Sequence, residues 1–177
     1  PRLYEHPHCV CGLVVEREWE GEKVVLKGLI REPEVTSLDN ISTILRRFQE
    51  ADVWSISSFR SSLRFGAVPR WLQYLLMWQK LDMSGKQRAK YIGTFGFTNY
   101  GMLGAESLHP IGPTTTVMTL SPISPDGGVT VKLVYDHRVL DGSYVARSLA
   151  HLEEVLHQTI LPELHGNLSD VASPHAA

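Results

Sequence analysis

The stretch YDHRVLDG at residues 135–142 is the most informative part of this chain. It contains His137, then Asp141 four positions later, then Gly142. Apolar residues that alternate over 129–135 predict a half-buried strand that ends at His137. Residues 141–143 predict a turn and a helix cap. An imidazole titrates near pH ~6.5, so a histidine held at this place can serve as a general base. The alternative is a core histidine beside an ordinary strand-to-helix turn.

A second stretch, GTFGFTNYGMLG at residues 93–104, adds context to the first. The octet resembles the D-H-R-V-x-D-G signature of the acyltransferase components of 2-oxo acid dehydrogenase complexes. Chloramphenicol acetyltransferases share its H-x-x-x-D-G core. The second stretch resembles the G-x-F-T-x-S-N-x-G-x-x-G segment of the same family. The resemblance extends over roughly residues 9–164.

This resemblance implies a fold and a reaction. The fold is α/β, a two-layer sandwich with a mixed β-sheet, as in chloramphenicol acetyltransferase. The reaction moves an acyl group between coenzyme A and a thiol or hydroxyl acceptor. His137 is implied as the general base that deprotonates the acceptor. Thr98 is the candidate donor to the oxyanion that forms on the thioester, and its neighbour Asn99 is the residue that could replace it.

The resemblance also assigns supporting roles around the histidine. Asp141 is implied to orient the histidine loop through an ion pair rather than to touch the substrate. The usual arginine partner lies in an N-terminal part of the family domain, which we expect this sequence to lack. Either another cation such as Arg138 therefore compensates, or the chain is incomplete. Gly142 lets the backbone turn, and Arg138 and Asn99 are expected to be structural.

Composition limits the classes of protein that need consideration. The chain has 177 residues, 43% of them hydrophobic and 20% charged, which is typical of one soluble globular domain. A net charge of −2 offers no basis for binding nucleic acid. Cys9 and Cys11 are too close together to staple a fold, so a reducing cytoplasm is expected. We expect an acyltransferase-like domain over 1–165, short at its N-terminus, and a disordered tail over 166–177.

Periodicity and turn residues predict the remaining elements. Strand pairs are expected at 8–19 with 23–30 and at 114–123 with 129–136. A short strand is expected at 95–98. Helices are expected at 37–50 behind an N-cap at Ser37, at 69–83, and at 143–159. Residues 55–62 predict a connector or the start of a short helix.

Residues 60–90 are locally basic and aromatic, with seven lysines and arginines against Asp82. Lys86, Arg88 and Lys90 are therefore secondary candidates for contacts with coenzyme A phosphates. An anionic membrane surface is another possible partner. We favour a third interpretation, a core or interface helix with solvated flanks, and do not expect membrane binding.

The residues His6, His8, Cys9 and Cys11 resemble a zinc cluster only at first sight. Strand alternation would send the histidines to one face and the cysteines to the other. No second ligand pair with recognisable spacing follows in the sequence. We therefore expect no metal.

Three functions remain open. The first is an acyltransferase that uses acyl-coenzyme A as substrate, assembles as a homotrimer and works with a small-molecule or lipoyl-carrying acceptor. The second is a non-catalytic assembly core or binding module derived from the same family. The third is a peripheral membrane protein that uses residues 71–90. The sequence names neither the acyl group nor the natural acceptor.

Overall fold

The computed structural model describes residues 4–171 of the chain. The chain divides into two compact units, residues 1–136 and residues 137–177. The first unit carries all five strands and helices α1 to α4, and the second carries helices α5 and α6. The predicted domain over 1–165 extends over both units and stays a prediction.

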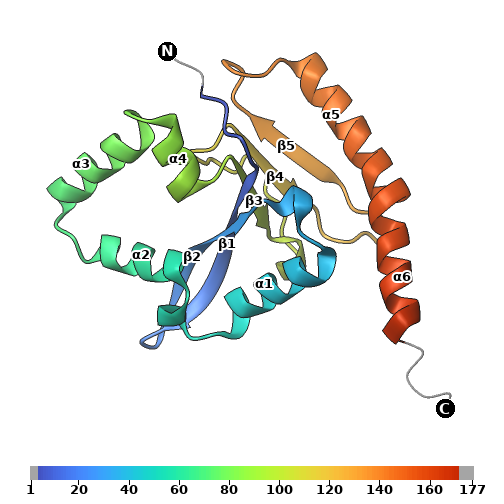
Figure 1. Ribbon diagram of the computed structural model, residues 1–177, viewed down its shortest axis with the longest axis horizontal. Coiled ribbons are helices and arrows are strands. Elements are labelled where there is room, and N and C mark those ends of the chain that lie inside the picture. The colour runs from blue at the N-terminus through green and yellow to red at the C-terminus, as the bar shows by residue number, and fades with distance from the viewer. Residues whose placement is uncertain (1–3, 172–177) are drawn as a thin grey trace. The chain divides into compact units, whose positions relative to one another are not determined.

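The first unit is built on a mixed five-stranded sheet (Figure 1). Its strands lie in the order β2 (Glu22–Arg31), β1 (Val10–Trp19), β3 (Phe95–Asn99), β4 (Thr116–Leu120) and β5 (Val131–Tyr135). The outer pairs, β1 with β2 and β4 with β5, are antiparallel, whereas β3 runs parallel to both β1 and β4. The predicted α/β class with a mixed sheet is confirmed.

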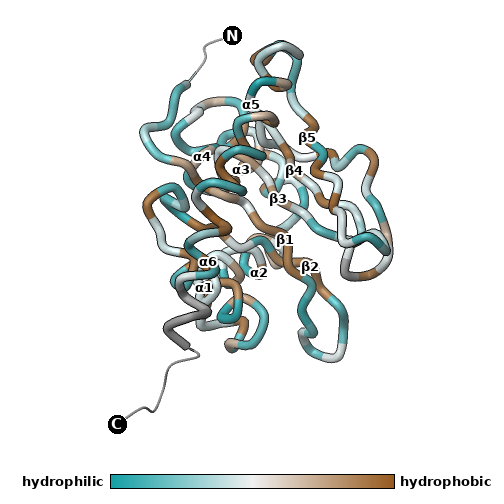
Figure 2. Tube along the Cα trace, turned by 90° about the vertical axis from the view of Figure 1, so that its right-hand side faces the viewer, coloured by the Kyte–Doolittle hydropathy of each residue, from teal (hydrophilic) through white to brown (hydrophobic). Residues whose placement is uncertain are grey.

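The hairpin β1–β2 forms one end of the sheet. Ten residue pairs run from Val10 opposite Arg31 to Trp19 opposite Glu22, and Glu20 and Gly21 make the two-residue turn. Both turn residues have positive φ, 52° and 80°, which suits the twist of a tight hairpin. In Figure 2 the strands are hydrophobic near the middle of the unit and hydrophilic toward this turn. Both predicted strands are therefore confirmed to within two residues.

The core of the first unit lies between this hairpin and two helices, α1 (Leu38–Glu50) and α2 (Ser57–Gly66). Phe59 is fully buried, and its ring lies 5.5 Å from that of Phe48. Ser37 caps α1 as predicted, accepting a hydrogen bond from the Asn40 N–H. At the other end, the Arg17 guanidinium donates to carbonyls that the last turn of α1 leaves open, 2.6 Å from Phe48 O and 2.8 Å from Ala51 O. These bonds fasten α1 to β1.

Residues 57–92 differ most from expectation. Of the two alternatives for 55–62, a connector or the start of a short helix, the second is confirmed, because α2 covers Ser57–Gly66. The predicted helix at 69–83 is α3 (Arg70–Leu81), but it is not a core helix, since none of its residues is buried. A further helix, α4 (Gly85–Ile92), was not predicted. Ser84 starts it by accepting a hydrogen bond from the Gln87 N–H. In Figure 1 these helices form an arc beside β2.

The second unit is one long run of helical residues from Gly142 to Val171. Helix α5 (Gly142–Val155) leads through a π-helical turn (Leu156–Ile160) into α6 (Leu161–Val171). The run exceeds the predicted 143–159, since a π-helical turn, closed by a bond from the Leu161 N–H to Leu156 O, continues the helix up to Pro162 and into α6. The start of the predicted disordered tail is thus helical, and 172–177 lies outside the described residues. Among residues 4–171, no helix combines the length and hydrophobicity that a bilayer crossing requires.

Gly28 offers a test of how closely α1 approaches the sheet. A Cβ placed there would lie 2.4 Å from a ring atom of Phe48, whose side chain is buried and has little room to move. We expect Gly28→Ala to lower the free energy of unfolding by about 1–3 kcal/mol through overpacking. Gly66→Ala is the matched control, since a Cβ there meets nothing within 4 Å. It should be neutral or stabilise the helix by up to about 1 kcal/mol. Urea denaturation followed by circular dichroism measures both, and equal effects would contradict the close approach.

Candidate functional site

The histidine lies in a turn rather than on a strand. Strand β5 ends at Tyr135, and the Asp136 N–H still donates to Thr115 O at 2.9 Å beside it. A turn then covers His137, Arg138 and Val139. The prediction that His137 ends the strand is therefore wrong by two residues. The reason is that the chain leaves the sheet directly after the last bond to the neighbouring strand segment.

Asp141 is the N-cap of α5. Its Oδ1 accepts two hydrogen bonds of 2.7 Å, one from the Ser143 hydroxyl and one from the Tyr144 N–H. The Ser143 hydroxyl, then the Tyr144 N–H and, more weakly, the charge of His137 hold the pKa of Asp141 below its usual range. The predicted turn and cap are confirmed, with Gly142 as the first helical residue. The aspartate thus holds the segment that follows His137 by capping the helix.

Thr98 lies on β3, directly opposite Thr119 of β4 in the parallel register. Residues that pair in this way point to the same face of the sheet. Both side chains are buried, Thr98 at 7% exposure and Thr119 at 0%. The Thr119 hydroxyl has no hydrogen-bond partner among the described residues. Sequence reasoning missed Thr119, because the pairing of β3 with β4 cannot be read from either strand alone.

Asn99 organises the loop after β3. Its Oδ1 accepts a 2.8 Å hydrogen bond from the Gly101 N–H, which turns the chain into the short 3₁₀ helix Gly101–Leu103. The role of Asn99 at the site stays a prediction. Thr98 and Asn99 belong to the first unit, whereas His137, Arg138, Asp141 and Gly142 belong to the second.

The three candidates for phosphate contacts differ in their surroundings. Arg88 donates two hydrogen bonds to the carbonyl of Pro113, one of them 2.6 Å long, and so ties α4 to the loop before β4. Lys86 is exposed. Lys90 lies 5.5 Å from the centre of the Tyr91 ring and lines a cavity. Arg88 therefore has a structural role, whereas the side chains of Lys86 and Lys90 are accessible to a ligand.

That cavity lies in the first unit and has a volume of about 790 Å³. Its walls come from β2, from the ends of α1 and α4, and from the facing sides of α2 and α3. Five cationic side chains line it: Lys27, Arg31, Arg47, Lys80 and Lys90. Of the predicted site residues, only Lys90 belongs to this lining. The sequence showed a basic segment at 60–90 but not that two of its lysines face cations of β2 and α1.

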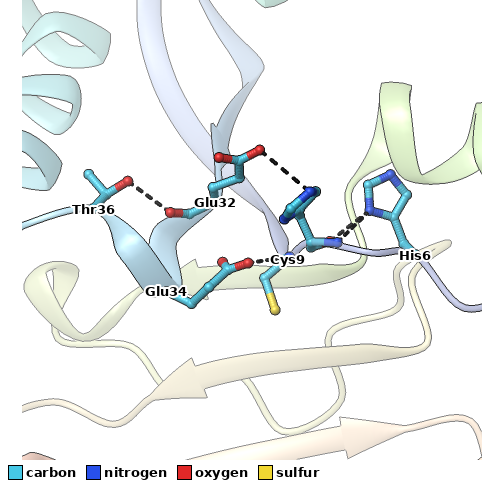
Figure 3. Close-up of polar contacts among 6 residues, drawn as sticks. His6, Cys9, Glu32, Glu34 and Thr36 are labelled. Atoms are coloured by element: carbon cyan, nitrogen blue, oxygen red, sulfur yellow. Dashed lines mark hydrogen bonds and ion pairs between the residues drawn. The ribbon is translucent and has the colours of Figure 1, made fainter.

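The histidines and cysteines near the N-terminus do not gather into a metal site. The His6 ring contacts the backbone of His8, and the Cys9 N–H donates to Glu34 Oε1 at 2.9 Å (Figure 3). Cys11 belongs to the core, and burial raises the pKa of its thiol to about 11. No group of three or more His, Cys, Asp or Glu side chains suited to a metal ion occurs in the part of the chain that the structure describes.

Neither the models of protein families nor the curated proteins contain a match to this sequence. Solved structures do contain similar chains. One, in the cubic core of the pyruvate dehydrogenase multienzyme complex, is 17% identical with a TM-score of 0.46, and the alignment covers 90% of this chain and 57% of that one.

Two further structures are similar to the same extent. The dihydrolipoamide acetyltransferase of Azotobacter vinelandii is 18% identical with a TM-score of 0.48, over 90% of this chain and 57% of that one. A probable dihydrolipoamide acetyltransferase from Listeria monocytogenes is 18% identical with a TM-score of 0.44, over 99% and 62%. This chain thus spans less than two thirds of the length of each of these structures.

The cap at Asp141 predicts a pH-dependent contribution to stability. Because its pKa is lower in the folded chain than the unfolded value of about 3.9, the stabilisation is present above that pH. It is lost as the pH falls through the folded pKa. Asp141→Ala should lower the melting temperature at pH 7, and the difference from wild type should close in acid. Asp141→Asn keeps an acceptor oxygen and should lose less. A constant difference down to pH 2 would contradict the role of the charge.

The unsatisfied hydroxyl of Thr119 predicts a stabilising substitution. A buried polar group without a partner costs about 1–3 kcal/mol, and valine has nearly the same shape. We expect Thr119→Val to raise the free energy of unfolding by about 1 kcal/mol. Thr119→Ser keeps the hydroxyl, loses a buried methyl group and should destabilise the chain. Chemical denaturation of wild type and the two variants measures these free energies of unfolding. A Val variant less stable than wild type would show that the hydroxyl has a partner.

Proposed function

We propose that this protein is an acyltransferase that moves an acyl group between coenzyme A and a thiol or hydroxyl acceptor. The observation that carries the proposal is the turn at residues 137–141. There His137 lies four residues before Asp141, which caps the helix that follows. A base next to a rigid, capped turn keeps its orientation from one catalytic cycle to the next.

In the proposed step, His137 takes the proton from the acceptor thiol or hydroxyl. The acceptor atom attacks the carbonyl carbon of the acyl-coenzyme A thioester, and a tetrahedral intermediate with a negative oxygen forms. The carbon–sulfur bond to coenzyme A then breaks, and the imidazolium returns its proton to the coenzyme A thiolate. No electron is gained or lost, so the step requires no redox partner.

The oxyanion requires a hydrogen-bond donor that is already in place. Thr98 is the proposed donor, because its side chain is buried at the end of a strand held by neighbours on both sides. A hydroxyl in such surroundings changes little between ground state and transition state. Asn99 and Arg88 are occupied with loop structure, which leaves Lys86 and Lys90 as candidates for contacts with the phosphates of the acyl donor.

The family resemblance extends the proposal to the assembly. In that family the histidine of one subunit meets the hydroxyl segment of the next, so we propose a homotrimer. A lipoyl-carrying protein is the proposed source of the acceptor thiol, and the cytoplasm is the proposed location. Light scattering on the purified chain tests the trimer directly.

Acyl transfer tests the proposed function. A panel of acyl-coenzyme A donors is incubated with dihydrolipoamide, and the S-acyl product is quantified by chromatography. His137→Ala should lower kcat by about 10²–10⁴-fold. Thr98→Val should lower it by about 10²–10³-fold, whereas Thr98→Ser should keep most of the activity. Exposed His151, which lies on α5 beside Glu154, provides a control in His151→Ala.

Two outcomes would contradict the proposal. Transfer that survives in His137→Ala would remove the base from the mechanism. Absence of transfer by a folded wild-type assembly, together with absence of acyl-coenzyme A binding in a titration, would favour the non-catalytic module. Circular dichroism on every variant separates a loss of chemistry from a loss of fold.

A further inference from the structure

The cavity beside β2 has an unusual balance of charge. Its five cations come from four elements: Lys27 and Arg31 from β2, Arg47 from α1, Lys80 from α3 and Lys90 from α4. None of the described residues that line it is acidic, and among the described residues none of the five forms an ion pair. Segments that are distant in sequence therefore place positively charged side chains around one cavity. Like charges repel unless an anion lies between them.

Lys27 shows the effect of this crowding. It is half-buried, and burial, together with the charge of Lys80, lowers its pKa to about 8. Lys80 is held in turn by two rings, with its Nζ 4.6 Å from the centre of Tyr91 and 5.3 Å from that of Phe65. Such cation–π contacts keep the ammonium group at the cavity. A bound anion would offset the repulsion between the two lysines.

The uncharged residues of the lining indicate what kind of group the anionic ligand carries. Hydroxyl groups of Ser57, Ser58 and Ser61 on α2 add hydrogen-bond donors. Apolar side chains, among them Ile44, Phe65 and Met77, make up much of the remaining wall. Binding sites for small molecules commonly combine an apolar wall with a few polar groups that fix orientation. Cations, hydroxyls and apolar surface together suit an anion with an apolar body.

We propose that this cavity is a binding site for a phosphate monoester that carries an apolar or aromatic group. Two negative charges on one compact head suit several converging cations better than a single carboxylate charge does. The volume of about 790 Å³ lies within the range of small-molecule sites. The proposed base and oxyanion donor are not part of this site, since neither His137 nor Thr98 lines the cavity, and Lys90 is the one residue proposed for acyl-donor contacts that does.

Isothermal titration of the full chain with phenyl phosphate tests the site. Inorganic phosphate and phenol serve as probes of the head group and of the ring. We expect phenyl phosphate to bind at least tenfold more tightly than either and to weaken as salt is raised. Equal affinity for inorganic phosphate would overturn the assignment to an ester, and absence of phenyl phosphate binding at millimolar concentration would overturn the site.

Variants locate the binding within the molecule. Lys80→Gln and Arg47→Gln should each weaken phenyl phosphate binding about tenfold, because each removes a charge-assisted contact. Arg46→Gln is the matched control for Arg47→Gln, since it removes the same charge from the next residue of α1 and does not line the cavity. Equal losses in the two arginine variants would overturn the proposal. If Lys80→Gln fails to fold, Lys90→Gln replaces it.

Two further experiments test whether the ester is a lipid or a soluble molecule, and whether its binding is independent of His137. Flotation with vesicles that contain phosphatidic acid, lost in Lys80→Gln, would identify a lipid head group. No flotation with retained phenyl phosphate binding would identify a soluble ester. His137→Ala should bind phenyl phosphate as wild type does, so failure of the proposed acyl transfer would leave this result unchanged. Loss of binding in folded His137→Ala would contradict a separate site.

Discussion

The parallel pairing of β3 with β1 is the constraint on which the rest of the first unit depends. It joins segments 84 positions apart through a bond from the Val10 N–H to the Thr94 hydroxyl (2.9 Å) and one from the Thr94 N–H to Val10 O (2.8 Å). The end of α4, which leads into β3, approaches β1 closely because Gly12 has no side chain. A Cβ there would lie 2.5 Å from Ile92 O. Closing so long a crossover costs conformational entropy, which the core beneath it must offset.

The register of that pairing decides which side chains lie on each face. Phe95 and Phe97 oppose Cys11 and Leu13 and pack against the hydrophobic core with α1 and α2. Because side chains alternate along a strand, Thr98 points to the other face, where it meets Thr119. A shift by one residue would exchange the two sets. The position of the candidate oxyanion donor is therefore a consequence of core formation on the opposite side of β3.

The outer edge of the sheet has a different character. An edge strand exposes unpaired backbone groups, and proteins commonly protect such edges with charged side chains and covering segments. Here β2 carries Lys27 and Arg31, and α2, α3 and α4 form an arc beside it (Figure 1). The result is the cationic cavity. The proposed phosphate site thus excludes His137 and Thr98, and of the residues proposed for acyl transfer only Lys90 lines it.

Local signals in the sequence were sufficient for several features. Alternation and turn residues predicted the first hairpin, the Ser37 hydroxyl predicted the start of α1, and the residues after His137 predicted a capped helix at Asp141. Each depends on residues within a few positions of one another, so propensity and capping decide them. The resemblance to acyltransferases supplied His137 and Thr98 as candidates, because a sequence motif can be recognised before the fold is known.

Other features required the tertiary structure. Contacts between distant segments decide four of them. These are the end of β5 two residues before His137, the exposure of α3, the pairing of Thr98 with Thr119, and the approach of Lys80 to Lys27. Apolar residues nearly all round α3 predict burial, but only the position of neighbouring elements decides whether burial occurs. The sequence alone thus determined local turns, caps and the candidate motif. Long-range strand pairing decided which side chains share a face or a cavity, because closing the chain over 84 positions depends on the whole core rather than on any local pattern.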